Sequence, residues 1–504
     1  MIPVVLEYKD NTYATISAEP SIRMELKSSL TFEAPDIKFH PMVRSGLWDG
    51  KIALYKGNAE IYLGLVPRVR QFCADRGYEV LVSSDIDKAF IDEELNASGF
   101  GLWASSLPLS AHGNDISPRP YQMSLAYKAV KYKRGIFKSA TATGKSLSQY
   151  LICRHLIDVA KIPGKILLLV PTVALVEQMY TDFADYSSKD DSFYAHPIMS
   201  KIYSGKDKAH CNKICVSTWQ SLQKIGKSTS SFPAEWFAQF DAVLVDETHT
   251  AESKEIKRIL ELCVNTEYRI GVSGTIKTNE LSMATLEGLI GPLTVIQTTK
   301  QAMDAGHIAK LNIKSVVLDY RNRSNLPDIS DYHDEIAFLT SDEARQKFIV
   351  KLALSLKGNT LIFFNLVEKH GRPLYELIKA AAGDTRNVYI VDGGVDVDDR
   401  ERIRRIIETE TNAIILASYG TSQTGTNFQN IQNGIFAAFS KSMVRVLQSI
   451  GRGLRKTSTK SEFTLFDIAD QITEKNASYR HLSERLEMYE AEGFSYTRSR
   501  IALM

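Results

Sequence analysis

The 504-residue chain has no long hydrophobic run and no recognisable export signal. No stretch approaches the ~18 consecutive apolar residues that cross a bilayer. The N-terminal octapeptide MIPVVLEY has neither a basic stretch nor a long apolar core, so it is unlike a signal peptide. We therefore expect a soluble, intracellular protein that contacts no membrane.

Charge of one sign and cysteine are also scarce. The chain has 61 basic and 59 acidic residues, a net charge of +2, so any nucleic-acid binding must come from local patches. Five cysteines, an odd number, indicate a reducing compartment. His210, Cys211 and Cys215 suggest half of a metal site. Because no second ligand pair accompanies them, we expect structural cysteines.

What the chain does have is a phosphate-binding signature in residues 134–150. Ile136 and Phe137 indicate a buried strand, a tight turn follows, and a helical pattern of apolar residues begins at Leu147. The backbone N–H groups of such a turn, together with the helix dipole, hold phosphates. The residues expected to bind the nucleotide here are Thr141, Ala142, Thr143, Gly144, Lys145 and Ser146. Lys145 is predicted to neutralise the β- and γ-phosphates and Ser146 to bind Mg²⁺.

Strand-like apolar runs alternate with helical stretches twice along the chain. The first set lies in residues 119–297 and the second in residues 311–470. This βαβ rhythm predicts an α/β fold with two parallel sheets, each covered by helices on both faces. The predicted divisions are a small α+β N-terminal domain with a linker that contains one short helix (1–112), two α/β domains (113–297 and 298–470) and a helical tail (471–504).

A local basic patch lies in the N-terminal domain. Residues 38–76 carry an excess of four positive charges, with aromatic residues among them. Phosphate contacts and base stacking need this mixture, and the candidate nucleic-acid contacts are Arg44, Trp48 and Lys51. The alternative is a solvated face with Trp48 in a small core, and composition alone does not separate the two.

Two adjacent carboxylates follow another apolar strand. The stretch 242–249 reads AVLVDETH, so Asp246 and Glu247 reach the same sheet edge as the phosphate turn. Asp246 can hold Mg²⁺ through its water shell, Glu247 can orient and deprotonate an attacking water, and His249 can reach toward the γ-phosphate. Other polar residues that follow neighbouring strands are expected on this binding edge: Pro171, Thr172, Thr218 and Trp219.

Two arginines lie three residues apart in the second α/β region. Arg452 and Arg455 share one face of the predicted helix QSIGRGLR. A guanidinium that reaches across a cleft stabilises the charge that develops in phosphoryl transfer. We predict that both act as arginine fingers.

Taken in order, these segments resemble the motifs of superfamily 2 helicases of the DExH type. The resemblance covers residues 119 to 456 and is carried by PYQ, TGKS, PTxxLxxQ, DETH, SGT, Leu361–Asn365, Gly420–Asn427 and QxxGRxxR. It implies two RecA-like domains that close on ATP and Mg²⁺, with Lys145, Asp246, Glu247, His249, Arg452 and Arg455 as catalytic residues. It also implies nucleotide contacts from Arg119, Tyr121, Gln122, Gly425 and Gln448, with Gln122 at the adenine edge. DNA contacts are expected from Pro171, Thr172, Thr218, Trp219, Asn365 and Thr421.

Within that superfamily the chain is most similar to the phage UvsW-type recombination helicases. The similarity rests on residues 42–51, on residues 417–420 with Thr424 and Gly425, and on Gln448–Arg455. It implies a motor, monomeric on DNA, that acts on forks, D-loops or Holliday junctions. Other recombination proteins are candidate partners, and the location is the host cytoplasm if the gene belongs to a phage. The departures from the family pattern, at Ser139, Thr248 and Asn427, remove no charged catalytic group.

Three alternatives share parts of this pattern. A double-strand DNA translocase, such as a restriction-system motor, would carry the same motor motifs, although the chain shows no clustered nuclease signature. An RNA helicase also fits, because motor motifs contact mainly the nucleic-acid backbone. A non-catalytic scaffold with a dead ATPase fold is disfavoured by intact Lys145, Asp246 and Glu247.

Overall fold

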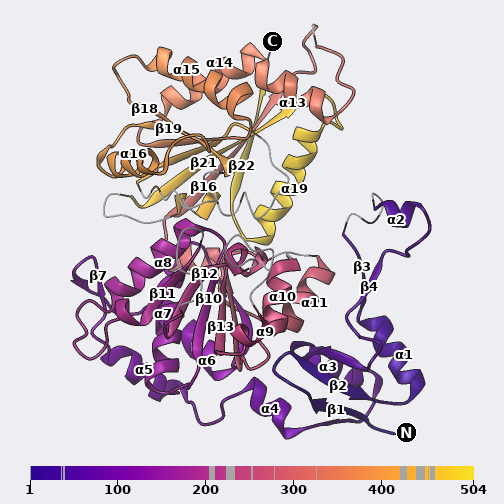
Figure 1. Ribbon diagram of the computed structural model, residues 1–504. Coiled ribbons are helices and arrows are strands. Elements are labelled where there is room, and N and C mark those ends of the chain that lie inside the picture. The colour runs from indigo at the N-terminus through magenta and orange to yellow at the C-terminus, as the bar shows by residue number, and fades with distance from the viewer. Residues whose placement is uncertain are drawn as a thin grey trace. The chain divides into compact units, whose positions relative to one another are not determined.

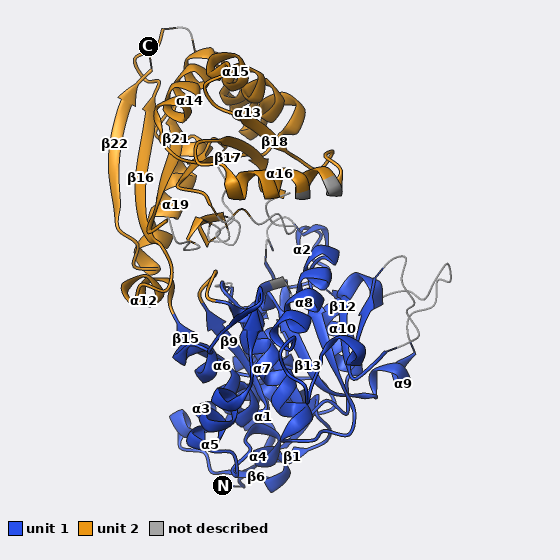
Figure 2. Ribbon diagram, turned by 90° about the vertical axis from the view of Figure 1, so that its left-hand side faces the viewer, with its two compact units in different colours: residues 1–139, 144–297 blue, residues 140–143, 298–504 orange. Residues whose placement is uncertain are grey.

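The structure is a computed structural model of the chain (Figure 1). It describes residues 2–35, 37, 40–203, 211–222, 233–250, 254–276, 279–324, 326–420, 428, 430–438, 446, 449–451, 453–454 and 460–503. The contacts divide the chain into two compact units, residues 1–139 with 144–297 (unit 1) and residues 140–143 with 298–504 (unit 2) (Figure 2). Each unit is built around one seven-stranded parallel sheet, which confirms the predicted fold of two tandem α/β domains.

The N-terminal module has a four-stranded sheet of order β5-β2-β1-β6. Its elements are β1 (Val4–Tyr8), β2 (Tyr13–Ser17), α1 (Pro20–Ser29), β5 (Glu60–Tyr62), η2 (Leu63–Leu65), α3 (Val66–Arg76) and β6 (Val80–Val82). The β1–β2 hairpin turns at Asp10, whose carboxylate accepts the backbone N–H groups of Thr12 and Tyr13 at 2.7 and 2.8 Å. α3 ends before Gly77, whose φ of 70° is the left-handed conformation that glycine adopts at helix ends. The predicted α+β module is confirmed.

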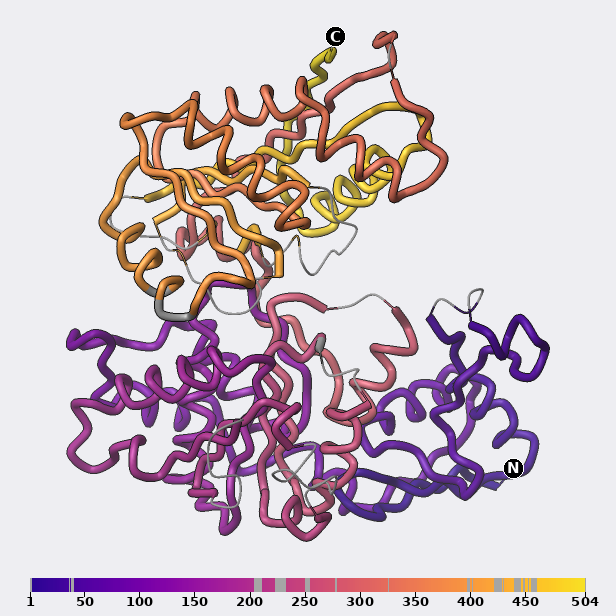
Figure 3. Tube along the Cα trace, turned by 45° about the horizontal axis from the view of Figure 1, so that its top comes forward, coloured from indigo at the N-terminus to yellow at the C-terminus, as the bar shows by residue number. Residues whose placement is uncertain are grey.

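A two-stranded arm leaves this module between α1 and β5. β3 (Thr31–Glu33) pairs antiparallel with β4 (Lys51–Ala53), and the short helix α2 (Pro41–Arg44) lies between them in sequence. Figures 1 and 3 both show this arm, residues 31–53, projecting from the module with α2 at its tip. The tip exposes Met42 and Leu47, the latter to 77%. The tip of the arm is therefore an exposed apolar surface with basic residues, Arg44 and Lys51, beside it.

Residues 84–115 are more structured than the predicted linker. Helices α4 (Ser84–Phe90) and α5 (Ala97–Ser106) precede a small hairpin of β7 (Ser110–Ala111) and β8 (Asn114–Asp115). The Asn96 side chain caps α5 by accepting the Gly99 N–H at 2.8 Å, and Phe100 packs in the core beside Trp103. The expectation of one short helix was incomplete, because tertiary contacts override the weak helix propensity of a Gly- and Ser-rich segment.

The sheet of unit 1 has the order β11-β12-β10-β13-β14-β9-β15. Its strands are β9 (Arg134–Ser139), β10 (Lys165–Val170), β11 (Met199–Ile202), β12 (Ile214–Thr218), β13 (Phe240–Asp246), β14 (Tyr268–Ser273) and β15 (Leu293–Gln297). The five central strands are those that the sequence predicts. The edge strands β11 and β15 were not predicted.

Alternate residues of the central strands face two different cores. Leu167 and Leu169 face one core, which contains α10 (Lys254–Leu262), α11 (Glu280–Leu289) and the N-terminal module. Leu168 and Val170 face the other, which contains α5, α6 (Pro120–Lys131), α7 (Lys145–Asp158) and α8 (Val173–Tyr186). Shorter helical turns complete the unit: η3 (His196–Ile198), η4 (Trp219–Leu222), α9 (Ala234–Phe237) and η5 (Thr248–Thr250).

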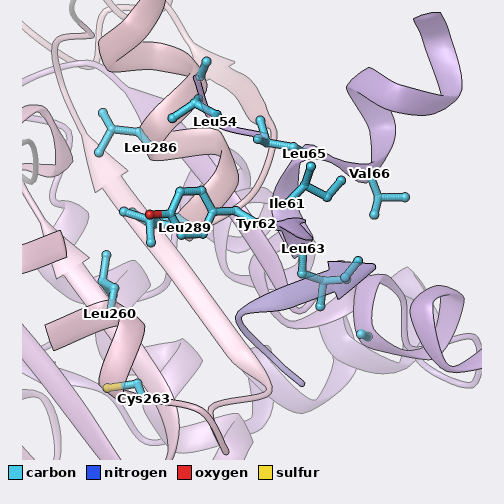
Figure 4. Close-up of a cluster of buried hydrophobic side chains, with 14 of the residues drawn as sticks. Leu54, Ile61, Tyr62, Leu63, Leu65, Val66, Leu260, Cys263, Leu286 and Leu289 are labelled. Carbon is cyan, nitrogen blue, oxygen red and sulfur yellow. The ribbon is translucent and has the colours of Figure 1, made fainter. Parts of the chain in front are cut away.

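The N-terminal module and the first sheet share one hydrophobic core. Tyr62 and Leu65 of the module pack among Leu260, Leu286 and Leu289 of α10 and α11 (Figure 4). The Tyr62 hydroxyl donates to the Glu261 carboxylate at 2.6 Å. A Cβ atom added at Gly64 would overlap the carbonyl oxygen of Glu287. The seam between module and sheet is therefore as closely packed as a domain interior.

Two fully buried arginines lie at this seam. Arg134 donates to the carbonyl oxygens of Ala89 and Asn11, each at 3.1 Å. Arg269 donates to the Thr12 hydroxyl at 2.8 Å and to the Cys263 carbonyl at 2.6 Å. Burial, followed by repulsion from Arg269, lowers the pKa of Arg134 to about 9. Both side chains link the module to the first sheet.

The sheet of unit 2 has the order β18-β19-β17-β20-β21-β16-β22. Its strands are β16 (Lys310–Asp319), β17 (Thr360–Phe364), β18 (Val388–Val391), β19 (Ile414–Ser418), β20 (Asn433–Phe436), β21 (Glu462–Gln471) and β22 (Tyr496–Ala502). Helices α13 (Tyr332–Ser341), α14 (Glu343–Ser355), the π-helical turn η6 (Val367–Gly371) and α15 (Arg372–Ala382) lie over one face, and α12 (Thr299–Asp304), α16 (Val397–Thr409) and α19 (Ala477–Ala491) over the other. Numbered along the chain, the strands of both sheets follow the order 3-4-2-5-6-1-7.

The C-terminal tail contains the expected helix, α19, but it does not end there. The chain continues as β22, which pairs in parallel with β16 at the edge of the second sheet. Exposed polar residues of this edge strand hid its pairing from the sequence pattern. The prediction of a purely helical tail was incomplete. Within the described residues, no helix combines the length and apolarity needed to span a bilayer.

Candidate functional site

The polar segments predicted to act together meet at the carboxyl edge of the first sheet. In the register of the strands, Val170 lies beside Thr218, Leu169 beside Val245, and Asp246 beside Val272. β9 pairs with β14 and leads into the turn before α7. The ends of β9, β10, β12, β13 and β14 therefore share one edge, where open parallel sheets bind ligands.

The turn after β9 has the backbone that a phosphate site needs. Ala142 and Gly144 both have left-handed φ values, 67° and 75°. Successive N–H groups in such a turn converge on an anion. Gly144 is the N-cap of α7 and has no side chain to cover the helix end, and a Cβ there would lie 2.6 Å from the Gln122 amide nitrogen. Ser139 is the last residue of β9, in extended backbone that requires no glycine.

The first turn of α6 contacts this phosphate-type turn. Gln122 accepts the backbone N–H of Arg119 at 2.8 Å and donates to the Gly144 carbonyl at 3.2 Å. The Arg119 guanidinium donates to the Tyr121 hydroxyl at 2.9 Å. Arg119, Tyr121 and Gln122, which are among the predicted nucleotide contacts, are thus joined to one another by hydrogen bonds. Gln122 also joins this group to the turn.

The two adjacent carboxylates lie in different electrostatic surroundings. Asp246 accepts the Gln149 side-chain N–H at 2.9 Å, while burial and the neighbouring charge of Glu247 raise its pKa to about 6. Burial alone would also raise the pKa of Glu247. The hydrogen bond from His249 and the charge of Lys145 outweigh burial and lower that pKa to about 2. Glu247 also has a left-handed φ of 49°, an uncommon conformation that often marks functional sites.

Glu247 and His249 belong to a hydrogen-bonded group with the end of β14. His249 Nδ1 lies 3.0 Å from the Ser273 hydroxyl and 3.3 Å from a Glu247 carboxylate oxygen. Ser273 donates to Glu247 at 3.2 Å, and Thr275 Oγ1 lies 3.3 Å from His249 Nδ1. A change at Glu247 therefore reaches the loop after β14 through two hydroxyls and one imidazole.

Thr248, one of the departures from the family pattern noted in the sequence, has a structural role. It is fully buried, and its hydroxyl lies 3.1 Å from the Val245 carbonyl and 3.2 Å from the Val272 carbonyl. A Cβ at Gly271 would lie 2.7 Å from that hydroxyl. The threonine is thus accommodated by a glycine on the next strand.

Two side chains that the sequence reasoning missed also reach the site. Gln149 contacts Asp246, as described above, and lies one helical turn after Lys145, a spacing that could have identified it. The Tyr186 hydroxyl, at the end of α8, lies 2.8 Å from the Ser146 hydroxyl. Forty residues separate Tyr186 from Ser146, and no local pattern signals this contact.

The candidate DNA contacts fall into three places. Thr172 caps α8 by accepting the Leu175 N–H at 3.3 Å, and the buried Thr218 hydroxyl lies 2.7 Å from that of Ser221. Pro171 precedes Thr172 and Trp219 follows Thr218, so all four lie at the carboxyl ends of the paired strands β10 and β12. Asn365 is exposed directly after β17 in unit 2.

The remaining candidates of this group lie on the arm. Arg44 and Lys51 are exposed there. Trp48 is half-buried and donates its indole N–H to the Lys51 carbonyl at 3.1 Å. The ring of His40 lies edge-on to that of Trp48, with centroids 5.0 Å apart. The aromatic ring is therefore held locally by the arm.

Several predicted residues lie outside the described part of the chain: Thr421, Gly425, Gln448, Arg452 and Arg455. Their neighbours Ile450 and Leu454 are buried in a core of unit 2. Cys211 and Cys215 are buried free thiols, in agreement with structural cysteines. In the described ranges no group of three or more His, Cys, Asp or Glu side chains could hold a metal ion.

Comparison with known proteins assigns this architecture to a class. Residues 115–278 match the family model "Type III restriction enzyme, res subunit", and residues 3–83 match "DNA helicase UvsW, N-terminal". The first match contains the sheet edge described above, and with two tandem RecA-like domains the chain is a superfamily 2 helicase motor. Across 99% of its length it is 32% identical to the whole of "ATP-dependent DNA helicase uvsW" of Enterobacteria phage T4. The chain belongs to the UvsW family of ATP-dependent DNA helicases.

Other similarities are weaker or structural. "DNA 3'-5' translocase XPB2" of Sulfurisphaera tokodaii is 22% identical over 80% of this chain and 91% of its own. The crystal structure of T4 UvsW matches with a TM-score of 0.54 and 29% identity, covering all of both chains. A fragment of a putative HsdR subunit of a type I restriction enzyme from Vibrio vulnificus matches with a TM-score of 0.57 at 17% identity, covering 86% of this chain and 74% of that one. This last similarity concerns the fold alone.

Proposed function

We propose that this helicase translocates on branched DNA and remodels it, as in fork regression or the migration of D-loops and Holliday junctions. The observation that carries the proposal is the meeting of a phosphate-type turn and a buried Asp-Glu pair at one sheet edge, in a chain whose N-terminal module matches that of UvsW. We infer that it works as a monomer on DNA, alongside other recombination proteins, in the host cytoplasm if the gene is a phage's.

ATP is proposed to place its phosphates against the turn before α7. The backbone N–H groups from Thr141 to Ser146 and the α7 dipole favour negative charge there, and Lys145 adds a full positive charge. Lys145 already influences both carboxylates. Its positive charge favours the ionised form of each, although burial and Glu247 outweigh this effect at Asp246, whose pKa is raised. Gln122 is the proposed adenine contact, with Arg119 and Tyr121 beside it.

The donor set also fits Mg²⁺. Asp246 is a buried carboxylate whose pKa is raised by burial, so a cation beside it would offset the cost of its charge. Ser146 supplies a hydroxyl that lies 2.8 Å from the hydroxyl of Tyr186, which holds it in place. Mg²⁺ bound here would neutralise phosphate charge during transfer. A site made from one carboxylate, one hydroxyl and the substrate's phosphates is usual for this ion.

Glu247 is proposed to orient the attacking water. Its pKa of about 2 keeps it ionised at neutral pH, so it accepts a hydrogen bond from that water in every protonation state of the site. His249 and Ser273 hold the carboxylate in place through contacts of 3.3 and 3.2 Å. A carboxylate this acidic is better suited to positioning than to storing a proton.

The second domain is proposed to complete the ATP site. Arg452 and Arg455 would act as arginine fingers, and Gly425 and Gln448 would contact the nucleotide. The assignment rests on the motif resemblance and on the general need of phosphoryl transfer for a positive charge opposite the phosphate turn. The domain divisions proposed with it are 1–112, 113–297, 298–470 and 471–504.

DNA is proposed to lie along both sheets and to reach the arm. Pro171, Thr172, Thr218, Trp219, Asn365 and Thr421 are the proposed contacts of the two motor domains, and Arg44, Trp48 and Lys51 those of the arm. Exposed Arg44 and Lys51 beside a half-buried tryptophan match the combination of phosphate contact and stacking found in nucleic-acid sites.

ATP hydrolysis with and without forked DNA tests the proposal. The wild-type rate should rise severalfold on addition of forked DNA, whereas Lys145→Ala should lose at least 100-fold, about 2.7 kcal/mol. Lys254→Ala, at an exposed lysine of α10, is the matched control and should behave as wild type. Equal rates in wild type and Lys145→Ala, or no response to forked DNA, would refute the proposal.

The role of the arm needs point variants rather than truncation. Removing residues 1–110 would expose the core shared with α10 and α11. It would also remove both carbonyl acceptors of Arg134 and the Thr12 hydroxyl that accepts from Arg269. Arg44→Glu with Lys51→Glu reverses two exposed charges without touching that core. This double variant should keep basal ATPase activity and bind a Holliday junction at least tenfold more weakly. Unchanged junction affinity would remove the arm from the DNA site.

A second candidate is a double-strand DNA translocase that does not separate strands. Its support is the similarity to "DNA 3'-5' translocase XPB2" and the match to the restriction-enzyme subunit model. Unwinding of a short tailed duplex would favour the helicase. Displacement of a triplex-forming strand without unwinding would favour the translocase.

A further inference from the structure

Unit 2 contains a cavity outside the proposed ATP site. It has a volume of about 220 Å³ and is lined by α13, the start of α14, the residues after β17, the π-helical turn η6 and the residues after β20. Complete ligand sites usually measure about 300–1,000 Å³. The cavity therefore has room for a single ring system rather than for a whole nucleotide.

The cavity opens at the carboxyl edge of the second sheet. Asn365 and Leu366 follow β17, Ala437 and Ala438 follow β20, and all four line the cavity. β17 and β20 are neighbours, with Phe363 beside Phe436. In the shared strand order these are strands 2 and 5, whose counterparts in unit 1 are β10 and β13. The cavity thus occupies the position at which unit 1 carries Thr172 and Asp246.

A buried histidine, His370 of η6, is one of the residues that line this space. It is 1% exposed, and its two ring nitrogens are buried and have no hydrogen-bond partner among the described residues. Burial, followed by repulsion from Arg345, lowers the pKa of His370 to about 3. The ring is therefore neutral at physiological pH and offers one N–H donor and one nitrogen acceptor. Leaving both unpaired costs about 1–3 kcal/mol for each group.

The cation that borders the cavity is already neutralised. Arg345 is buried and donates to the Asp470 carboxylate at 2.8 Å and to the Ala437 carbonyl at 2.7 Å. With a neutral histidine and a paired arginine, the lining provides no net charge for a phosphate. An aliphatic side chain would fill the volume but leave His370 unsatisfied. The matching ligand is neutral and planar, with a donor and an acceptor on one edge.

We propose that this cavity binds one unstacked nucleobase of the DNA on which the motor acts. The inference rests on the proposed function. His370 pairs with the edge of the base, and Tyr332, which is 44% exposed at the rim, provides a ring on which it stacks. Asn365, exposed directly after β17, is the proposed contact to the sugar-phosphate backbone of the same nucleotide. A base held in this way would fix the position of one nucleotide of the DNA strand on unit 2.

Base removal combined with mutation tests the proposal. Forked DNA carrying a single abasic site at successive positions is titrated against wild-type protein in the presence of a non-hydrolysable ATP analogue. At one position, loss of the base should weaken binding about tenfold, since stacking one base contributes ~1–3 kcal/mol. In His370→Phe and in Tyr332→Ala this penalty should fall below twofold, although intact forked DNA still binds.

His155→Phe is the matched control. His155 is also buried, with its pKa lowered by burial to about 4, but it packs between Phe100 and Trp103 in unit 1. The variant should keep the full tenfold penalty. Tyr332→Ala alters an exposed rim residue and so decides the test if His370→Phe does not fold.

Two results would overturn the proposal. One is a wild-type protein that binds forked DNA and hydrolyses ATP but shows no position with a base-dependent penalty. The other is a penalty of equal size in wild type and Tyr332→Ala. If wild type fails to bind forked DNA at all, the proposed function fails first and the base site fails with it. The ATPase measurement on the same preparation distinguishes these cases.

Discussion

The two sheets share a strand order, but the buried arginines around the sixth strand of each sheet are compensated differently. In unit 1, Arg134 and Arg269 donate to carbonyl groups and to one hydroxyl, and burial lowers the pKa of both. In unit 2, Arg345 pairs with Asp470 and Arg485 with Asp467, at 2.8 and 2.9 Å. Burial would lower the pKa of Arg345 and of Arg485. Their carboxylate partners have the larger effect, so the pKa of each arginine is raised.

The sixth strand shows the contrast directly. It carries a buried cation, Arg269, on β14 and two buried anions, Asp467 and Asp470, on β21. The unit 2 pairs stabilise a sheet and its own helices. Arg134 and Arg269 in unit 1 instead contact the N-terminal module, through Asn11 and Thr12. Their positive charges have no carboxylate partner, and the hydrogen bonds that they make hold the module against the sheet. Two RecA-like domains with the same strand order can therefore compensate buried charged side chains in different ways.

The largest expected effect is on the paired arginine of unit 2. Asp470→Asn leaves Arg345 buried without its counter-charge and should destabilise unit 2 by about 3–5 kcal/mol. All four tryptophans, Trp48, Trp103, Trp219 and Trp236, belong to unit 1. Urea unfolding followed by circular dichroism should therefore shift more than unfolding followed by tryptophan fluorescence. Equal shifts of both signals would contradict an effect confined to unit 2.

The second effect concerns the edge of the first sheet, where Asp246 and Glu247 lie. The pKa of Asp246, about 6, lies above its ordinary value of 3.8, so the folded state binds this proton more tightly than the unfolded state does. Its contribution to stability is present at low pH and is lost as the pH rises to about 6. Asp246→Asn should thus stabilise the nucleotide-free protein by up to about 3 kcal/mol at pH 8 and by about half as much at pH 5, while ATPase activity is lost. Tryptophan fluorescence at the two pH values measures this, and a loss of stability at pH 8 would exclude the explanation.

A smaller effect is expected where the module meets Arg269. Thr12→Val keeps the shape of a buried residue but removes the hydroxyl that accepts from the guanidinium. The loss should be about 2 kcal/mol, as for a hydrogen bond to a charged group, and should appear in the tryptophan signal. Thr12→Ser restores the acceptor and is the control. If both variants unfold at the same urea concentration, the hydroxyl does not fasten the module.

The smallest effect is at a helix end. In unit 2 the Glu335 carboxylate accepts the backbone N–H groups of Ala477 and Ser478, each at 2.7 Å, and so covers the start of α19. In unit 1 the start of α7 has only Gly144 as its cap. Glu335→Gln should cost about 1 kcal/mol, seen by circular dichroism. No change would indicate that water replaces the carboxylate.

Local patterns predicted eleven of the fourteen strands of the two large sheets, because buried parallel strands are continuous apolar runs. They did not predict β11, β15 or β22, since an edge strand has one neighbour and tolerates mixed residues. Lys145, Asp246 and Glu247 came from motifs, and the structure places them within reach of one another's charge. The Tyr186 contact and the arginines at the seam depend on pairs far apart in sequence, which no single-sequence pattern contains.

The shared core at the seam also has a mechanical meaning. A module joined by a flexible linker would follow the motion of the motor domain only in part. Here Arg134, Arg269 and the packing around Tyr62 leave no hinge between module and sheet. A rotation displaces each point in proportion to its distance from the axis, so we expect the projecting arm to amplify small turns of the first sheet. We therefore expect the distance that the tip of the arm moves in each ATP cycle to depend on the length of the arm.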